Sequence, residues 1–241
     1  LVALAHDPTA SDQDEYDVLV ELGLADKATA DWINLREVVH RGIAVADRLG
    51  DPVALARVAV MTSIDALWQS AYHGEVDDVT VDALRRALDE LPATDDELRS
   101  RTMMALAGEL YYGVSAQERD ALAEQAVAMA RRIGDPALLT STCQSAFVVT
   151  WRPGTVEQRV ELAAEALAIA ERMQDERMLV YARTLRAVVA SETGDVATYT
   201  ACVTAARDAA EEQRNLYALA VLDSLEIPWA AMRGQFDRAG E

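Results

Sequence analysis

Turn residues recur along this sequence at a nearly constant interval of 40. Five glycines follow one another at intervals of 39, 41, 40 and 40 residues, and a second row of turn residues, spaced by 40, lies between them. A fixed period of this length is typical of repeat proteins, and two turns per period predict two elements in each repeat. The two rows are Gly74, Gly113, Gly154, Gly194 and Gly234, and Asp95, Asp135, Asp175 and Asn215.

The segments between the turns have the composition and periodicity of helices. They are rich in Ala, Leu, Arg and Glu, which are good helix formers, and in segment 155–174 the apolar residues step by 4, 3 and 4 in two rows. Two apolar rows on one helix predict that it is covered on two sides. We therefore expect helices at 12–27, 29–49, 52–73, 79–91, 95–112, 116–133, 136–151, 156–173, 176–193, 195–213 and 216–233.

Capping motifs support several of these starts. Three pairs fit the capping box, in which a Ser or Thr precedes a Glu or Gln by three residues: Thr94 with Glu97, Ser115 with Glu118, and Thr155 with Gln158. One breaker lies inside a predicted helix: Pro228 lacks an N–H and predicts a kink. The predicted fold is all-α, an α–α superhelix of antiparallel helix pairs with a period of about 40 residues.

The ends and the hydropathy of the chain carry further expectations. The first residue is Leu1 rather than an initiator Met, and we expect 1–241 to be a single helical array cut from a longer protein. The apolar face of 217–233, which a further repeat would cover, should then be exposed. With no run of 18 apolar residues and no signal peptide, we expect a soluble, cytoplasmic, non-membrane protein.

Composition argues against two function classes. Asp and Glu total 41 against 22 Lys and Arg, and a net charge of -19 repels phosphate backbones, so this segment is not expected to bind nucleic acid. Lys27 is the sole lysine and does not follow a glycine-rich loop, which excludes a P-loop within these residues.

The residues that commonly carry chemistry are scattered. Cys143 and Cys202 have no Cys-x-x-Cys partner and predict buried free thiols. His6, His40 and His73 form no metal-binding pair, and we expect them at the surface or at helix ends. The sequence therefore predicts a protein that is not an enzyme, with no catalytic, cofactor-binding or metal-binding residue.

The acidic runs Asp77-Asp78 and Asp95-Asp96-Glu97 keep an enzymatic alternative open. Aspartate-rich helices hold magnesium in all-helical prenyl-transfer enzymes, so an all-α metal-dependent enzyme is one alternative. These runs lie at predicted helix starts, however, where the helix dipole favours acidic residues without a metal. A magnesium titration followed by calorimetry separates the two interpretations.

Aromatic residues recur near the ends of the helix pairs. Similar placement in successive repeats could line a groove for a peptide or a small ligand, and the alternative is packing between repeats. Truncation to Ala that weakens binding but spares stability would indicate the groove, whereas a loss of about 3 kcal/mol or more would indicate packing. The candidate groove residues are Trp68, Tyr72, Tyr111, Tyr112, Trp151 and Arg152.

Six segments in this order resemble a known family. They are 15–23 (EYDVLVELG), 46–52 (ADRLGDP), 106–112 (LAGELYY), 130–136 (ARRIGDP), 151–155 (WRPGT) and 233–239 (RGQFDRA). Together they resemble the tetratricopeptide-like helical region of large bacterial AAA/STAND-type signal-transduction ATPases. Such ATPases carry a LuxR-type or SARP-type DNA-binding domain or a nucleotide-cyclase domain.

The resemblance implies a sensor or transmission module. Such a module mediates protein–protein interaction or binds a small-molecule or peptide effector, and passes the change to an attached ATPase or effector domain. No catalytic residue carries over, and the period of 40 exceeds the 34 residues of a regular tetratricopeptide repeat. A free-standing tetratricopeptide-like scaffold without an ATPase is the other alternative.

Overall fold

The computed structural model describes residues 10–29, 31–63, 74–113 and 115–239, and these residues form helices without any strand. The chain divides into two compact units, Leu1–Thr150 and Trp151–Glu241. The helices are α1 (Asp12–Ala28), α2 (Trp32–Leu49), α3 (Pro52–Ala59), the 3₁₀ turn η2 (Val60–Thr62), α4 (Asp78–Glu90), α5 (Glu97–Glu109), α6 (Ala116–Ile133), α7 (Pro136–Val149), α8 (Val156–Met173), α9 (Glu176–Thr193), α10 (Val196–Glu212), α11 (Leu216–Met232) and α12 (Phe236–Ala239).

The prediction of helices rather than strands is confirmed, and most predicted boundaries agree with the structure within two or three residues. The exception is the helix predicted at 52–73. Its α-helical part ends at Ala59, and η2 extends it to Thr62. Residues 64–73 lie outside the described part of the chain.

Side-chain caps begin most of the helices, as the sequence predicts. Asp135, Asp175 and Asn215 each accept a hydrogen bond from the second or third backbone N–H of the helix that follows. Ser115 does the same for α6, with its Oγ 3.2 Å from the N of Glu118. Such a bond satisfies an N–H that has no partner inside the helix.

Two of the predicted capping boxes are wrong. Asp96, not Thr94 or Asp95, caps α5, and its carboxylate accepts from the N–H groups of Leu98 and Arg99. Asp95 instead pairs with Arg132, with both oxygens 2.8 Å from the guanidinium. A carboxylate one residue before the helix is a stronger acceptor than a hydroxyl three residues before it.

The second error concerns Thr155. It occupies the position before α8, but its side chain makes no cap hydrogen bond. Its hydroxyl turns back and donates to the carbonyl oxygen of Arg152 at 2.9 Å. The helix therefore begins at the predicted place without the predicted capping box.

The ends of α8 and α9 need a left-handed residue. Gly194 closes α9 with φ 76°, a conformation that glycine adopts without strain. The left-handed residue at a helix end is not always glycine, because Gln174 takes the same role at the end of α8 with φ 53°. The helix and turn are thus retained even where the glycine is missing.

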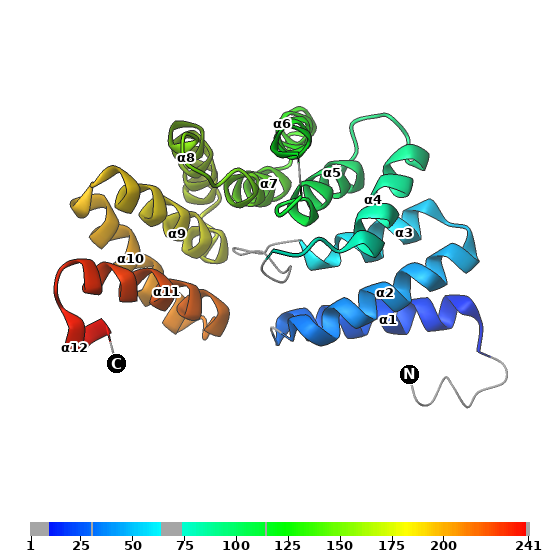
Figure 1. The fold of residues 1–241 in the computed structure, drawn as a ribbon, viewed down its shortest axis with the longest axis horizontal. Coiled ribbons are helices and arrows are strands. Elements are labelled where there is room, and N and C mark those ends of the chain that lie inside the picture. Colours follow the sequence, from blue (N-terminus) through cyan, green and yellow to red (C-terminus); the bar gives the residue numbers. More distant parts are fainter. Residues whose placement is uncertain (1–9, 30, 64–73, 114, 240–241) are drawn as a thin grey trace. The chain divides into compact units, whose positions relative to one another are not determined.

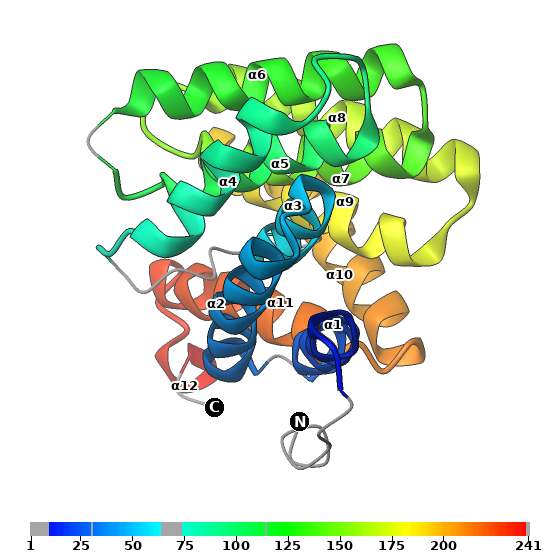
Figure 2. The same ribbon diagram turned by 90° about the vertical axis from the view of Figure 1, so that its right-hand side faces the viewer.

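In the unit Leu1–Thr150, each helix packs on its neighbours in sequence. Helices two apart in the order also make contact: α3 with α5, α5 with α7, and α2 with α4. Figure 1 shows α5 and α7 side by side with α6 above them. In Figure 1 and in Figure 2, α6 lies on the opposite side of α5 from α2.

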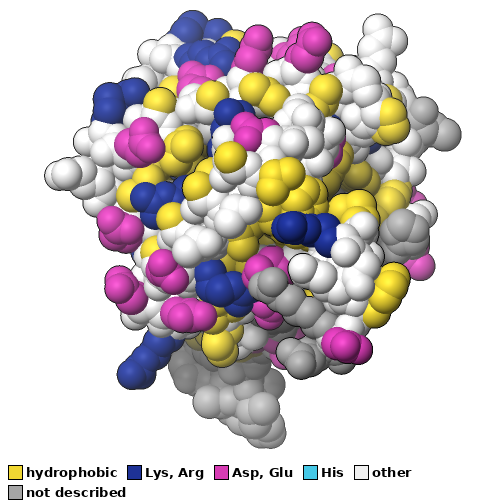
Figure 3. All heavy atoms as spheres, turned by 90° about the vertical axis from the view of Figure 1, so that its left-hand side faces the viewer, with side chains coloured by type: hydrophobic (Ala, Val, Ile, Leu, Met, Phe, Trp, Pro, Cys, Tyr) yellow, Lys and Arg dark blue, Asp and Glu magenta, His cyan; other side chains and the backbone are white. Residues whose placement is uncertain are grey.

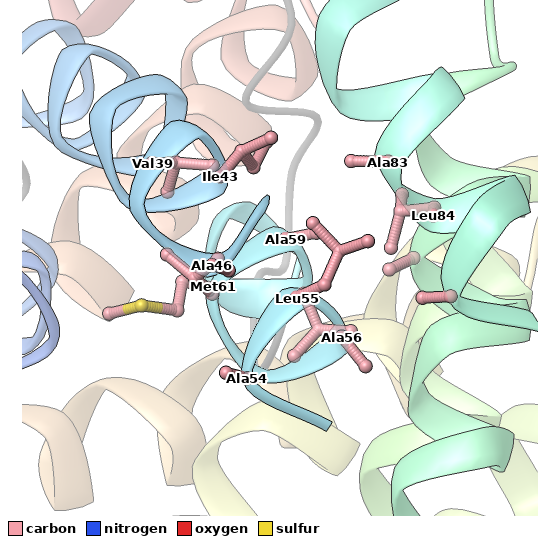
Figure 4. Close-up of a cluster of buried hydrophobic side chains, with 14 of the residues drawn as sticks. Val39, Ile43, Ala46, Ala54, Leu55, Ala56, Ala59, Met61, Ala83 and Leu84 are labelled. Atoms are coloured by element: carbon pink, nitrogen blue, oxygen red, sulfur yellow. The ribbon is translucent and has the colours of Figure 1, made fainter. Parts of the chain in front are cut away.

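The core of this unit is built from small and branched side chains (Figure 4). Val39, Ile43 and Ala46 of α2 face Leu55 and Ala59 of α3, and Ala83 and Leu84 come from α4. Gly42 lets α2 and α3 approach closely, because a Cβ at this position would overlap Cγ2 of the fully buried Val58. Small residues at the contact allow this short separation.

The unit Trp151–Glu241 repeats the pattern of neighbour packing. Helix α9 contacts α8, α10 and α11, and α12 contacts α11. Tyr199 stacks on Trp229 with the ring centroids 4.3 Å apart. Pro228 lies inside α11, which continues to Met232. Within the stretch 217–233, the apolar side chains of Ile227 and Met232 are 48% and 72% exposed.

Three further properties bear on function: the distribution of charge, the hydropathy of the helices and the state of the cysteines. On the face drawn in Figure 3, acidic and basic side chains are interspersed rather than gathered in separate patches. Within the described ranges, no helix has a stretch long and apolar enough to cross a bilayer. Both cysteines are free thiols, Cys143 buried as predicted and Cys202 half-buried.

Candidate functional site

The structure places four of the six predicted groove residues. Tyr111 and Tyr112 lie in the turn after α5, and Trp151 and Arg152 lie between α7 and α8, at the start of the second unit. All four are half-buried. Trp68 and Tyr72 fall outside the described residues. The six are therefore not brought together in one described site, and each placed pair is described within its own unit.

The first aromatic pair rests on a buried arginine. The rings of Tyr111 and Tyr112 meet edge to face with centroids 5.0 Å apart. The guanidinium carbon of Arg119 lies 5.4 Å from the centroid of Tyr111, and its Nη1 donates to the Tyr111 carbonyl oxygen at 2.9 Å. A cation held over a ring face is attracted by the ring quadrupole. We call Tyr111, Tyr112 and Arg119 the tyrosine–arginine cluster.

In the second unit, an arginine also lies on an aromatic ring. The guanidinium carbon of Arg159 lies 5.5 Å from the centroid of Trp151. Its Nη1 and Nη2 donate to Oε1 and Oε2 of Glu192, each at 2.6 Å, and its Nε donates to the Thr155 hydroxyl at 3.3 Å. Arg159 is 1% exposed, so this two-pronged carboxylate pair compensates a buried charge.

Arg119 and Arg159 were missed in the sequence reasoning, although a signal was present. Each arginine follows an aromatic residue by eight positions, Tyr111 and Trp151, and the two arginines are 40 residues apart. Each also lies four residues after the residue that precedes its helix, Ser115 or Thr155. The shared spacing places both guanidinium groups on the preceding aromatic ring.

A buried polar network in the first unit gave no sequence signal. Asp77 precedes α4, and its carboxylate accepts from the N–H of Thr80 at 3.2 Å and the hydroxyl of Thr80 at 3.0 Å. From α2, Nε2 of His40 lies 2.7 Å and Nη1 of Arg36 lies 3.4 Å from Oδ2 of Asp77. Burial alone would raise the pKa of Asp77, but the hydrogen bonds from His40 and Thr80 outweigh it, and the pKa is lowered. His40 lies mid-helix rather than at a helix end, and its side chain is 37% exposed.

Glu109, the last residue of α5, interacts electrostatically with Asp77 and Arg36 of this network. It is 3% exposed, its Oε1 accepts from the Thr62 hydroxyl at 2.8 Å, and its Oε2 is buried without a hydrogen-bond partner. Burial raises the pKa of Glu109, against the opposing effects of Thr62 and of Arg36. A buried carboxyl group with a shifted pKa marks this network as a candidate binding or switching site.

The acidic runs that suggested a metal have other contacts. Asp77 and Asp96 cap helices, and Asp95 pairs with Arg132. In the described portion of the chain, no group of three or more His, Cys, Asp or Glu side chains has the geometry to hold a metal ion. Asp77 and Asp96 thus act at helix starts, where the helix dipole also favours an acidic side chain.

One pocket lies in the first unit between α5 and α7. The hydroxyls of Ser141 and Thr142 on its wall donate to the carbonyl oxygen of Leu138. Arg101 reaches it from α5 while its Nε pairs with Glu97 at 2.9 Å. The lining residues are Ser63, Arg101, Met104, Ala105, Ser141, Thr142 and Ser145.

No protein-family model and no curated protein matches the sequence. The site is therefore interpreted from its own geometry.

Proposed function

We propose that this chain is a non-catalytic helical-repeat module of a cytoplasmic bacterial signal-transduction ATPase or transcriptional regulator, where it binds a protein partner or an effector. The proposal includes a tetratricopeptide-like superhelix with a period of about 40 residues. The attached ATPase or effector domain would read out the binding event.

The observation that carries the proposal is the regular recurrence of capped helices. Helices α6, α8 and α10 begin at Ala116, Val156 and Val196, and the starts of α7, α9 and α11 follow the caps Asp135, Asp175 and Asn215. Within each of the two series, successive positions are 40 residues apart. A stack of such units has one long surface and suits recognition rather than bond chemistry.

The tyrosine–arginine cluster is the contact site we favour. Its two tyrosines combine half-buried rings with polar tips, the type of surface on which binding sites are often built. The ring of Tyr111 already lies on Arg119, and so truncating it would also disturb the packing of α6. We choose Tyr112 as the probe, whose ring meets that of Tyr111 edge to face.

The experiment begins with the complete gene. Under this proposal an ATPase domain with a P-loop is encoded in the same protein, and the purified whole protein hydrolyses ATP at a rate that Tyr112→Ala changes. Leu216→Ala, at an exposed position of the second unit, is the matched control. A gene without an ATPase domain would favour the free-standing scaffold. Heat released on binding magnesium to the isolated chain would favour the enzyme alternative.

A further inference from the structure

The two arginines that lie on aromatic rings are equivalent in sequence but not in their partners. For Arg159, the structure records hydrogen bonds from Nε, Nη1 and Nη2, to Thr155 and Glu192. For Arg119 it records one, from Nη1 to the Tyr111 carbonyl oxygen. Its Nε is buried and has no hydrogen-bond partner.

The missing partners have two identifiable causes. Ser115, which corresponds to Thr155, uses its hydroxyl to cap α6 at the N of Glu118. The residue forty positions before Glu192 is Arg152, so the sequence supplies no carboxylate at the corresponding position. A buried guanidinium with unmade hydrogen bonds is costly, and Arg119 is only 7% exposed.

One acidic group is near Arg119 but does not fill this role. Oδ1 of Asp120 lies 3.5 Å from Nε, beyond the usual length of a charge-assisted hydrogen bond. Asp120 is the next residue in the chain, and its contact is with Nε, whereas Glu192 contacts Nη1 and Nη2 of Arg159. The end of the Arg119 side chain at Nη2 has no recorded hydrogen bond in the described residues.

We infer that the tyrosine–arginine cluster is a recognition site for a carboxylate, supplied by a Glu or Asp side chain of a protein partner. This carboxylate pairs with Arg119 as Glu192 pairs with Arg159. The aromatic rings of Tyr111 and Tyr112 would cover the acidic side chain's apolar stem. The identity of the source as a protein rests on the proposed function, whereas the carboxylate chemistry rests on the two arginines alone.

The test follows the Nε–H signals of the two arginines by NMR in the whole 241-residue chain. Arg119→Lys and Arg159→Lys assign the signals, and the unmodified protein is then titrated with N-acetyl-L-glutamate N-methylamide. We expect a saturable shift of the Arg119 signal with a midpoint on the order of 10 mM, as one charge-assisted contact would give. The Arg159 signal, already paired, should not move.

Three further titrations define the chemistry. The matching glutamine derivative should leave both signals unchanged. Inorganic phosphate should bind more weakly than the glutamate derivative. Asp120→Asn should tighten glutamate binding several-fold, because it removes a competing negative charge beside Nε.

The inference is wrong if Arg119 shows no saturable shift, if the glutamine derivative shifts it equally, or if Arg159 responds in parallel. Tighter binding of phosphate would also overturn it. These outcomes do not depend on ATP hydrolysis, so the carboxylate site and the proposed regulatory function can fail separately.

Discussion

His40 and Asp77 are 37 residues apart in the sequence, and their side chains meet at 2.7 Å. The contact joins the middle of α2 to the start of α4, and Arg36 approaches the same oxygen of Asp77 from one turn earlier. Asp77 therefore does more than cap a helix. It ties α2 to the start of α4, although α3 and η2 lie between these two helices in the sequence.

Replacing Asp77 with Asn should lower the free energy of unfolding by about 2 kcal/mol at pH 7. Asn retains capping ability, so the loss reports the charge-assisted contacts with α2. Because the folded pKa of Asp77 is lowered, its contribution exists above the ordinary aspartate pKa and disappears as the pH falls through the folded value. Denaturant unfolding at several pH values measures it.

Asp78→Asn is the control, since Asp78 is exposed in the first turn of the same helix. It should cost less than about 1 kcal/mol, as expected for an exposed charge near a helix dipole. Equal losses in the two variants would show that the contact with His40 contributes nothing beyond the dipole.

Glu109→Gln should act in the opposite direction. Gln keeps an acceptor for the Thr62 hydroxyl and removes the buried charge, so the variant should be more stable than wild type by about 1 to 3 kcal/mol at neutral pH. The folded pKa of Glu109 is raised, so wild-type stability is greatest below the ordinary glutamate pKa and falls as the pH rises through the folded value.

The advantage of Glu109→Gln should therefore shrink as the pH is lowered. Glu90→Gln, at an exposed position ending α4, provides the baseline in the same denaturation series. A variant that is less stable than wild type at neutral pH would show that the ionised carboxylate has a stabilising partner.

The predicted helices and the predicted candidate site differ in how far the sequence determined them. Helix starts at Pro136, Glu176 and Leu216 could be found because capping is local: the residue that caps lies within three positions of the N–H it satisfies. The caps assigned to Thr94 and Thr155 failed for local reasons too: Asp96 caps α5 in place of Thr94, and the Thr155 hydroxyl donates to the Arg152 carbonyl oxygen.

The buried network could not be found in this way. Glu109 follows an ordinary helical stretch, and its burial depends on Thr62 lying beside it, 47 residues away in the sequence. No spacing in one segment records such a meeting. The contacts of Arg119 and Arg159 with aromatic rings could be predicted only in part. The interval of eight residues between each arginine and an aromatic residue is visible in the sequence, but only the structure shows that the two side chains meet.

Glu192→Gln should destabilise the protein by about 3 kcal/mol, because it leaves the guanidinium of Arg159 buried without a compensating charge. Glu118→Gln is the control. Its partner Arg85 is 51% exposed, and an exposed pair contributes less than about 1 kcal/mol. Similar losses for the two variants, measured by urea unfolding, would contradict the distinction between the two pairs.

Gly42→Ala tests the close approach of α2 and α3. Helix propensity alone would make alanine more stable by about 1 kcal/mol, but the added methyl meets Val58, and we expect a net loss of about 1 to 3 kcal/mol. Val58→Ala in the Gly42→Ala background should recover part of that loss. A stabilised single variant would show that the helices can separate without cost.

The central claim is that this chain regulates a catalytic domain and has no catalytic activity itself. ATP hydrolysis measured on the complete protein, on its Tyr112→Ala variant and on the 241-residue chain alone tests it most directly. We predict no hydrolysis by the isolated chain, hydrolysis by the complete protein, and a several-fold altered rate in Tyr112→Ala with unchanged thermal stability. ATP hydrolysis by the isolated chain, or a complete protein whose rate is indifferent to Tyr112→Ala, would contradict the account.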